Sequence, residues 1–219
     1  MPQIIALWCV PGVQASGITR IMQNAQHYSC HETPFAEAWY QGESPLWPAY
    51  EKSDPTTPGL SLDSVLTALD AQARHRDLFV WDSPHFLSTF WNNETVSLFT
   101  HCFLICEPGA ALQAADGHRV TTADVEDAFD QQRRLFDHVS DVTHDIPLVI
   151  DCAALAKDPK GMAKVWTTAI GLRDVPLTFH GLASQPNPVD LNALSDAAKN
   201  VYLRTRPHYD HLAQYQLKA

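Results

Sequence analysis

The sequence lacks several features that would place a protein in a class at once. No stretch approaches the ~20 consecutive apolar residues of a membrane span, and the N-terminus has no basic-then-apolar signal pattern. There is no internal repeat or low-complexity tract, and no cysteine pair has zinc-ribbon spacing. We therefore expect a cytoplasmic protein with no metal site and no membrane contact.

Cysteines and basic residues are both scarce. The five cysteines are odd in number and several lie in apolar runs, which favours free buried thiols over disulfides. The 15 Lys and Arg residues stand against 25 Asp and Glu residues, which gives a net charge of −10. An acidic surface of this kind argues against nucleic acid as the main partner.

The opening of the chain has the outline of an anion-binding loop. An apolar run over residues 4–10 stops at Pro11 and Gly12, and apolar residues with helical spacing follow. Backbone N–H groups and the positive end of a helix dipole meet in such a strand–loop–helix turn. However, no Lys or Arg lies between Trp8 and Thr19, so no charged side chain of the loop would hold a phosphate or sulfate.

The rest of the chain alternates apolar strands with helices. Further strands are predicted at 77–81, 99–106 and 146–151, and helices at 61–69, 122–139, 160–171 and 190–216. Uninterrupted apolar strands separated by helices indicate a parallel sheet covered on both faces. We expect one α/β domain over residues 1–219, from which an aromatic and proline-rich excursion leaves at about 36–58.

Nine short segments carry a family resemblance, and they occur in the family's order along most of the chain. They are Trp8 with Pro11, and residues 31–35, 81–85, 99–108, 132–137, 147–151, 158–159, 170–172 and 206–212. Together they resemble the small bacterial members of the sulfotransferase-like P-loop family. The resemblance implies a parallel sheet flanked by helices. It also implies sulfonyl transfer from 3′-phosphoadenosine 5′-phosphosulfate (PAPS) to a small hydroxylated metabolite in biosynthesis.

The resemblance places the PAPS contacts on the first loop and helix, at Gly12, Ser16, Gly17 and Thr19. The family's basic residue and hydroxyls in this loop are replaced, because the corresponding positions include Gly12, Val13 and Ala15. Other family cations and hydroxyls would fall at Trp81, Cys106, Gly109 and near Ala114. Each lost charge-assisted contact removes ~1.5–3 kcal/mol, so the cofactor site is degenerate and independent PAPS-dependent activity is doubtful.

Four polar residues near predicted strand ends are the catalytic candidates. His31 and Glu32 follow the first helix, where a neighbouring carboxylate can orient an imidazole that deprotonates an acceptor hydroxyl. Asp82 and His85 follow the strand at 77–81, at the edge where open α/β sheets bind ligands. The structural alternatives are local hydrogen bonding for the first pair, helix capping for Asp82, and a packed or exposed ring for His85.

Other residues have a structural explanation that we prefer. His101 lies within an apolar strand and is expected to be a core histidine with satisfied hydrogen bonds. Arg133 and Arg134 are expected on a solvated helix face, and Arg119 in an exposed loop. The alternative is that these arginines replace a lost phosphate contact.

Aromatic residues gather near the excursion. Trp39, Tyr40, Trp47 and Tyr50 lie close together, and such patches usually mark a pocket or an interface. We therefore expect them to contact an organic substrate or a partner subunit.

Three functions remain open from the sequence. We favour a sulfotransferase-related protein that takes part in sulfonyl transfer to a small hydroxylated metabolite. The first alternative is a non-catalytic subunit that pairs with a competent sulfotransferase as a hetero-oligomer. The second is a repurposed enzyme whose loop holds a smaller anion, such as a carboxylate.

Overall fold

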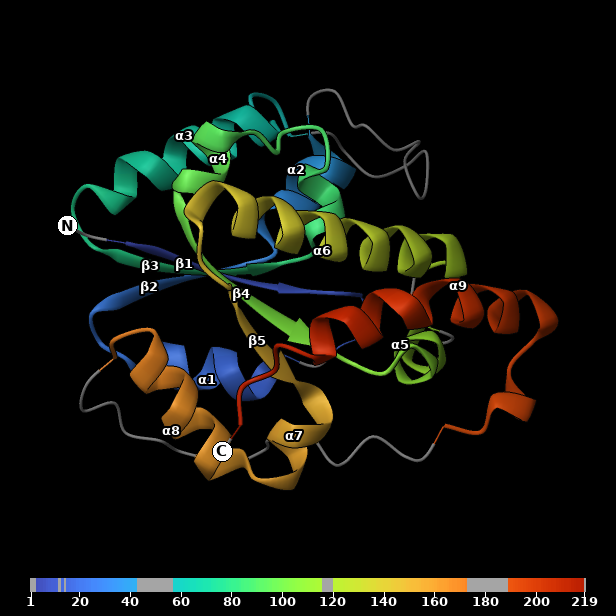
Figure 1. Cartoon of the computed structure of the whole chain (residues 1–219). Coiled ribbons are helices and arrows are strands. Elements are labelled where there is room, and N and C mark those ends of the chain that lie inside the picture. The colour runs from blue at the N-terminus through green and yellow to red at the C-terminus, as the bar shows by residue number, and fades with distance from the viewer. Residues whose placement is uncertain are drawn as a thin grey trace.

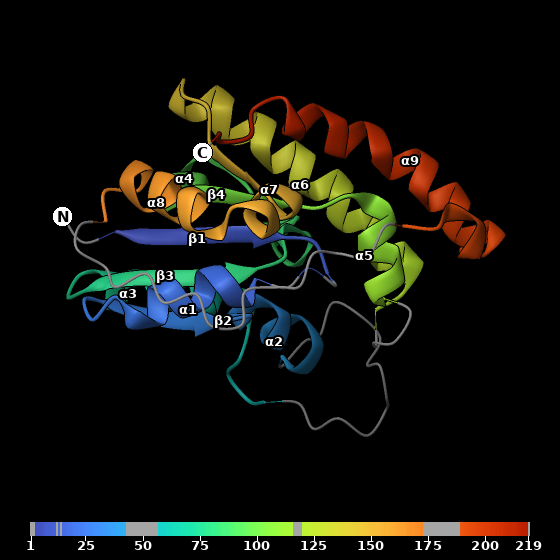
Figure 2. The ribbon, with the colours of Figure 1, turned by 90° about the horizontal axis from the view of Figure 1, so that it is seen from below.

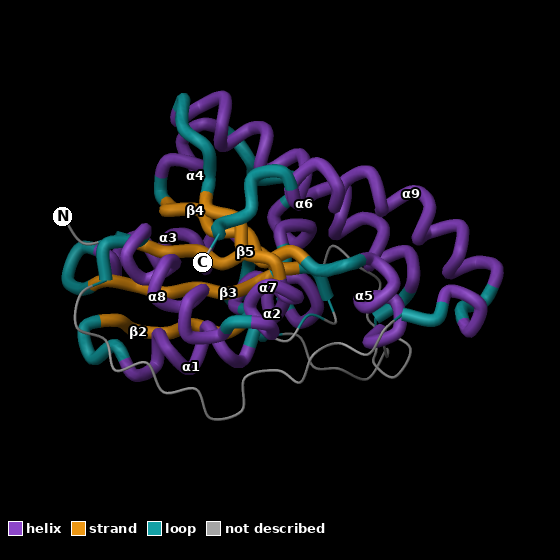
Figure 3. Tube along the Cα trace, turned by 60° about the horizontal axis from the view of Figure 1, so that its bottom comes forward, coloured by secondary structure: helices purple, strands orange, loops and turns teal. Residues whose placement is uncertain are grey.

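Five parallel strands form the centre of the molecule. The computed structural model describes residues 3–11, 13, 15–42, 57–115, 120–172 and 189–218, without the side chains of Ser16 and Ala115. The strands are β1 (Ile4–Cys9), β2 (Tyr28–Glu32), β3 (Asp77–Asp82), β4 (Phe99–Ile105) and β5 (Leu148–Asp151). They lie side by side in the order β2-β3-β1-β4-β5, and every pair is parallel (Figures 1 and 3). The predicted α/β class with a parallel sheet is confirmed.

Strand β2 was not predicted. Its sequence, Tyr-Ser-Cys-His-Glu, is polar, and its residues are half-buried or exposed, whereas β1 is buried along its whole length. The difference arises because β2 is at the edge of the sheet and pairs only with β3. An edge strand does not need the apolar run by which the inner strands are recognised.

Helices cover both faces of the sheet. α1, α7 and α8 lie on one face, and α2, α3, α4 and α6 on the other, with α5 and α9 near the carboxyl ends of the strands (Figures 1 and 2). Their bounds are α1 Ser16–Asn24, α2 Pro34–Gln41, α3 Leu62–Ala73, α4 Asn93–Ser97, α5 Pro108–Ala115, α6 Thr122–Thr143, α7 Cys152–Lys157, α8 Pro159–Ala169 and α9 Asp196–Ala213, with short 3₁₀ turns at Pro84–Leu87 and Leu191–Ala193. Among these helices none has the length and apolarity needed to span a membrane.

The predicted helix starts agree with the local chemistry. The side chains of Ser61 and Thr121 each accept a hydrogen bond from the backbone N–H three residues on. The side chain of that third residue in turn accepts from the backbone N–H of Ser61 or Thr121. Such capping boxes satisfy backbone donors that the first helical turn leaves unpaired. They fix the starts of α3 and α6 independently of tertiary packing.

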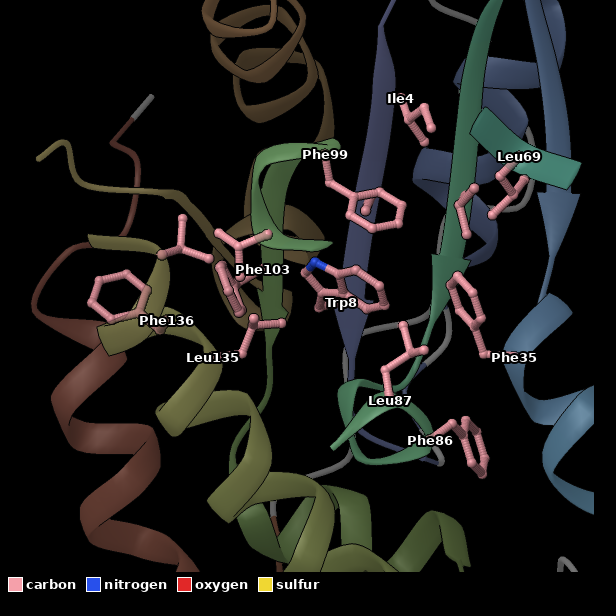
Figure 4. Close-up of a cluster of buried hydrophobic side chains, with 14 of the residues drawn as sticks. Ile4, Trp8, Phe35, Leu69, Phe86, Leu87, Phe99, Phe103, Leu135 and Phe136 are labelled. Carbon is pink, nitrogen blue, oxygen red and sulfur yellow. The ribbon is translucent and has the colours of Figure 1, made fainter. Parts of the chain in front are cut away.

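Two apolar layers fill the spaces between the sheet and the helices. Along β1, Ile4, Ala6 and Trp8 face one layer, and Ile5 and Leu7 face the other. Trp8 lies at the centre of the first layer, between the rings of Phe35 and Phe99 (Figure 4). Because both faces are covered, the inner strands carry apolar residues on both faces rather than on alternate positions.

His101 belongs to this core, as predicted. Trp8 Nε1 donates to His101 Nδ1 at 2.9 Å, so His101 Nε2 carries the proton and donates to the carbonyl oxygen of Val96, also at 2.9 Å. Burial lowers the pKa of His101 to about 4, so the ring is neutral at physiological pH. Both ring nitrogens are satisfied inside the protein.

Candidate functional site

The strand order defines where a ligand would bind. The connection from β1 runs through α1 on one face of the sheet, and the connection from β4 runs through α5 and α6 to the other side (Figure 1). β1 and β4 are neighbours, so their carboxyl ends form the switch point of the sheet. In open α/β sheets ligands bind at this edge.

The chain fills this switch point with its own side chains. Val10 and Cys106, which follow β1 and β4, are buried in an apolar cluster with Phe129 of α6. Gln132 of α6 is buried, and its amide nitrogen donates to the carbonyl oxygens of Trp8 at 3.0 Å and Leu104 at 3.2 Å. One side-chain amide therefore joins the ends of β1 and β4.

Replacing Gln132 with leucine is expected to lower the free energy of unfolding by about 2 kcal/mol, because two buried carbonyl groups lose their donor. Urea unfolding monitored by circular dichroism measures the change. Gln113→Leu, at an exposed position of α5, is the matched control and should change stability by less than about 0.5 kcal/mol. Equal effects of the two substitutions would contradict the bridging role of Gln132.

The predicted cofactor residues are only partly described. Gly12 and the side chain of Ser16 lie outside the described residues. Gly17 is buried within α1, and the Thr19 hydroxyl donates to the carbonyl oxygen of Ala15 at 3.1 Å on the same helix. Ala15 gives the start of α1 no side-chain cap.

Asp82 caps a helix. One carboxylate oxygen accepts from the N–H groups of Phe35 at 2.7 Å and Ala36 at 3.2 Å in α2, and the other accepts from Ser83 N–H at 2.8 Å. Burial raises the pKa of Asp82 to about 7, against these three donors, which lower it. Asp82 thus ties the end of β3 to the start of α2.

His85 pairs with the neighbouring serine. Ser83 Oγ lies 2.7 Å from His85 Nδ1, and both residues are buried at the carboxyl end of β3. Burial lowers the pKa of His85 to about 4, so the imidazole is neutral at physiological pH. A neutral imidazole has one N–H donor and one acceptor nitrogen, so it can donate a hydrogen bond to a polar ligand atom or accept one from it.

His31 and Glu32 are separated by the sheet. They are consecutive residues of β2, so their side chains leave opposite faces. The Glu32 carboxylate accepts from Gln23 of α1 at 3.3 Å, on the opposite face from His31. His31 Nε2 is buried and has no hydrogen-bond partner among the described residues. Glu32 is therefore not the group that orients His31.

The aromatic residues of α2 pack against the core. The Trp39 ring lies 6.3 Å from His85 and 5.8 Å from Phe86, and the Tyr40 ring lies 5.5 Å from Phe86. Both are half-buried and contact the apolar layer that contains Trp8. Trp47 and Tyr50 lie outside the described residues.

Two more carboxylates at this edge also cap helices. Glu107, after β4, accepts from Ala110 N–H of α5 at 3.2 Å. Asp151, the last residue of β5, accepts from Ala153 N–H at 2.6 Å and Ala154 N–H at 3.2 Å in α7. Sequence reasoning did not assign these roles, although an acid between an apolar strand and a helix is a recognisable capping pattern.

Residues of α9 also lie at the carboxyl edge of the sheet, and they were not among the predicted site residues. The Tyr209 hydroxyl donates to the second oxygen of Asp151 at 2.7 Å. Arg206 bonds to Asp210 at 2.8 Å and to the Tyr202 hydroxyl at 3.0 Å, and its Nη1 lies 3.6 Å from Glu107 Oε1. No local sequence signal predicts that a helix near the C-terminus meets the ends of β4 and β5.

Three thiols lie at the same edge. Cys9, Cys106 and Cys152 are free, and burial raises the pKa of each far above the ordinary value of a thiol, with neighbouring carboxylates adding to the effect. The thiolate form of each is therefore strongly disfavoured at neutral pH. No group of His, Cys, Asp and Glu among the described residues has the arrangement of a metal site.

The predicted surface arginines are on a solvated face. Arg133 pairs with Asp137 at 2.7 Å and Arg134 with Asp130 at 2.8 Å, each one turn away on α6. In these i,i+4 pairs each arginine is bonded to a carboxylate of the same helix. Arg119 lies outside the described residues.

No protein-family model and no curated protein matches the sequence. Among solved structures, a sulfotransferase from Alicyclobacillus acidocaldarius is similar, with a TM-score of 0.58 and 13% identity over 99% of this chain and 97% of that one. The chain has a sulfotransferase-like fold. The tunicamycin resistance protein of Deinococcus radiodurans is also similar, with a TM-score of 0.48 and 17% identity over 80% of this chain and 99% of that one.

At the starts of α2, α5 and α7 the described residues do not fit PAPS, which carries several negative charges, whereas the first loop is only partly described. The described residues supply three carboxylates and three protonated thiols. Among the described residues, Arg206 supplies a positive charge at the ends of β4 and β5. Its guanidinium already bonds to Asp210 and to the Tyr202 hydroxyl and lies near Glu107. The start of a helix attracts anions, but a carboxylate beside it offsets this attraction. A polyanion therefore gains little binding free energy at these helix starts.

Proposed function

We propose that this chain takes part in sulfonyl transfer to a small hydroxylated metabolite as the supporting subunit of a competent sulfotransferase. The observation that carries the proposal concerns the backbone N–H groups at the carboxyl edge of the sheet. The fold is sulfotransferase-like, but three helix starts at its edge are engaged by the chain's own carboxylates. A partner would then supply the cofactor site.

A calorimetric titration with adenosine 3′,5′-bisphosphate tests this proposal. We expect no detectable binding by the lone chain at low or moderate salt, because Glu107 and Asp151 repel the phosphate groups and Arg206 is already bonded to Asp210. Micromolar binding would overturn the supporting role, since it would mean that the chain holds the nucleotide itself.

Pairing is tested by co-expression with a sulfotransferase-like chain of the same organism that retains the basic loop residue. We expect the two chains to co-purify and Trp39→Ala to weaken the pair, because Trp39 is half-buried beside the edge. Asp141→Ala, at an exposed position of α6, is the control. Purification of this chain alone in every combination would contradict the proposal.

A second candidate function is turnover of a hydroxylated metabolite with a smaller or uncharged second ligand. The observation that favours it is the buried pair of Ser83 and His85. Neutral His85 can accept a hydrogen bond from an acceptor hydroxyl and orient it, while Ser83 fixes the orientation of the ring. In that case the lone chain has an activity without PAPS that His85→Gln abolishes and that does not depend on a partner.

A further inference from the structure

The segment that follows α9 covers one edge of the sheet. β5 is the last strand in the order β2-β3-β1-β4-β5, so its outer side faces away from the other four strands. Gln216 lies beside Val149 in a parallel bridge, and the Leu217 N–H group donates to the carbonyl oxygen of Val149 at 2.8 Å. We call Gln216 and Leu217 the strap, because they cover an edge that β5 would otherwise expose.

The strap also lies where the chain passes from one apolar layer to the other. Leu212, near the end of α9, belongs to the layer that contains Trp8, whereas Leu217 packs against the layer that contains Ile5. The chain after α9 therefore crosses the sheet edge beside β5 and reaches the side of α7 and α8 (red trace in Figure 1). The two layers hold the two ends of this crossing.

The edge under the strap is suited to pairing with another strand. Val149 and Ile150 are almost fully buried, and the unpaired backbone groups of an apolar edge strand are a template for a further strand. The other edge strand, β2, is polar and carries the exposed Glu32, and charged side chains protect an edge from association. Pro147, directly before β5, has no N–H group, so pairing does not extend toward the amino end.

Two exposed apolar side chains flank the strap. Ile146, two residues before β5, is 56% exposed. Tyr215, directly before the strap, is 37% exposed, although its ring also contacts Phe136 at a centroid distance of 5.1 Å. Exposed apolar groups that gather beside a sheet edge are typical of a surface that a partner covers. A second copy of this chain offers the same strand and the same apolar groups, so the edge is complementary to itself.

The strap is held by fewer contacts than the strands. Among the described residues, its backbone contacts with the sheet are confined to Val149, whereas β5 pairs with β4 along four residues. Gln216 and Leu217 are half-buried, and Lys218 beside them is exposed. Segments with few buried contacts open before the whole fold unfolds. The strap can therefore leave the edge while the sheet stays intact.

We propose that the strap is a built-in cover that prevents this chain from pairing with a second copy through the edge of β5. When the strap leaves, two β5 strands meet antiparallel about a two-fold axis, with Val149 of one copy opposite Ile150 of the other. Asp151 of each copy then lies opposite Leu148, so the two carboxylates do not face each other. The inference concerns contacts between copies of this chain and does not depend on a sulfotransferase partner.

Sedimentation velocity over a range of protein concentrations tests the proposal. Leu217→Pro removes the N–H group that donates to Val149, and we expect it to lower the dissociation constant of the dimer at least tenfold relative to the unchanged chain. Lys218→Pro is the matched control, because it introduces the same residue one position later and leaves the Leu217 N–H group in place. Far-UV circular dichroism checks that each variant is folded.

A second substitution shows whether the association uses the β5 edge. Ile146→Lys places a charge beside this edge at an exposed position, so we expect it to reverse the gain when it is combined with Leu217→Pro. Leu203→Lys, at a position of α9 that is 67% exposed, adds the same charge elsewhere and should not reverse the gain.

Hydrogen exchange of the unchanged chain gives a readout that needs no variant. The Leu217 amide should exchange at least tenfold faster than the amides of β4, because the strap opens without the sheet. If Leu217→Pro does not fold, Leu217→Ala takes its place, since it keeps the N–H group but removes the side chain that packs against the layer of α7 and α8.

Three results would overturn the inference. The first is an equal dissociation constant of the dimer in the Leu217 variant and in Lys218→Pro. The second is an equal effect of Ile146→Lys and Leu203→Lys on the association. The third is exchange of the Leu217 amide as slow as that of the β4 amides. Failure to co-purify with a sulfotransferase-like chain would contradict the supporting role but leave these comparisons intact.

Discussion

Replacing Trp8 with alanine is expected to lower the free energy of unfolding by about 4 kcal/mol, enough to threaten folding of a domain with ordinary stability. Trp8 is fully buried, with 0% exposure, and its ring contacts Phe35, Trp91 and Phe99 at centroid distances of 5.2 to 6.2 Å. Alanine leaves a cavity that these rings cannot close without shifting. Urea unfolding monitored by circular dichroism measures the loss.

A second variant separates packing from hydrogen bonding at Trp8. Trp8→Phe keeps an aromatic ring but removes the N–H group that donates to His101, so a loss of about 1 to 2 kcal/mol is expected. Trp39→Ala serves as the comparison, because Trp39 is half-buried and should cost less than Trp8→Ala. A loss below about 1 kcal/mol for Trp8→Ala would contradict the arrangement of this layer.

The second large effect is a dependence of stability on pH that arises from Asp82. Its pKa is about 7 in the folded protein, against an ordinary value of 3.8 for an aspartate side chain. A raised carboxyl pKa stabilises the fold at low pH, and this contribution is lost as pH rises from about 4 through 7. At about 1.4 kcal/mol for each unit of pKa difference, the unchanged chain should lose about 2 to 3 kcal/mol between pH 5 and pH 8 through this group.

The measurement compares unfolding free energies of the unchanged chain and Asp82→Asn at several pH values. The asparagine variant is less stable throughout because its NH₂ group faces a backbone donor, but it lacks the Asp82 titration. Asp141→Asn, at an exposed position, removes the same charge and should keep the pH dependence of the unchanged chain. Parallel stability curves for the unchanged chain and Asp82→Asn would show that Asp82 does not titrate between these pH values.

Local sequence patterns are sufficient to predict several parts of the fold. Apolar runs identified β1, β3 and β4 because inner strands of a parallel sheet are buried on both faces, and they identified the edge strand β5 because Val149 and Ile150 are buried as well. The starts of α3 and α6 lie close to the predicted ones, because a capping box is completed within four residues. The core role of His101 followed from its place in an apolar run.

The roles of the polar residues at the sheet edge, in contrast, depend on contacts between segments that are far apart in the sequence. Asp82 is a helix cap because the distant helix α2 brings it N–H donors, and Asp151 receives the hydroxyl of Tyr209 from the distant helix α9. His31 and Glu32 leave opposite faces of β2 because successive side chains of a strand alternate. Gln132 and Arg206 reach the ends of the strands from helices whose packing no local pattern specifies. Burial and the choice of hydrogen-bond partner are set by which segments meet in space, so the sequence located the edge of the sheet but not its chemistry.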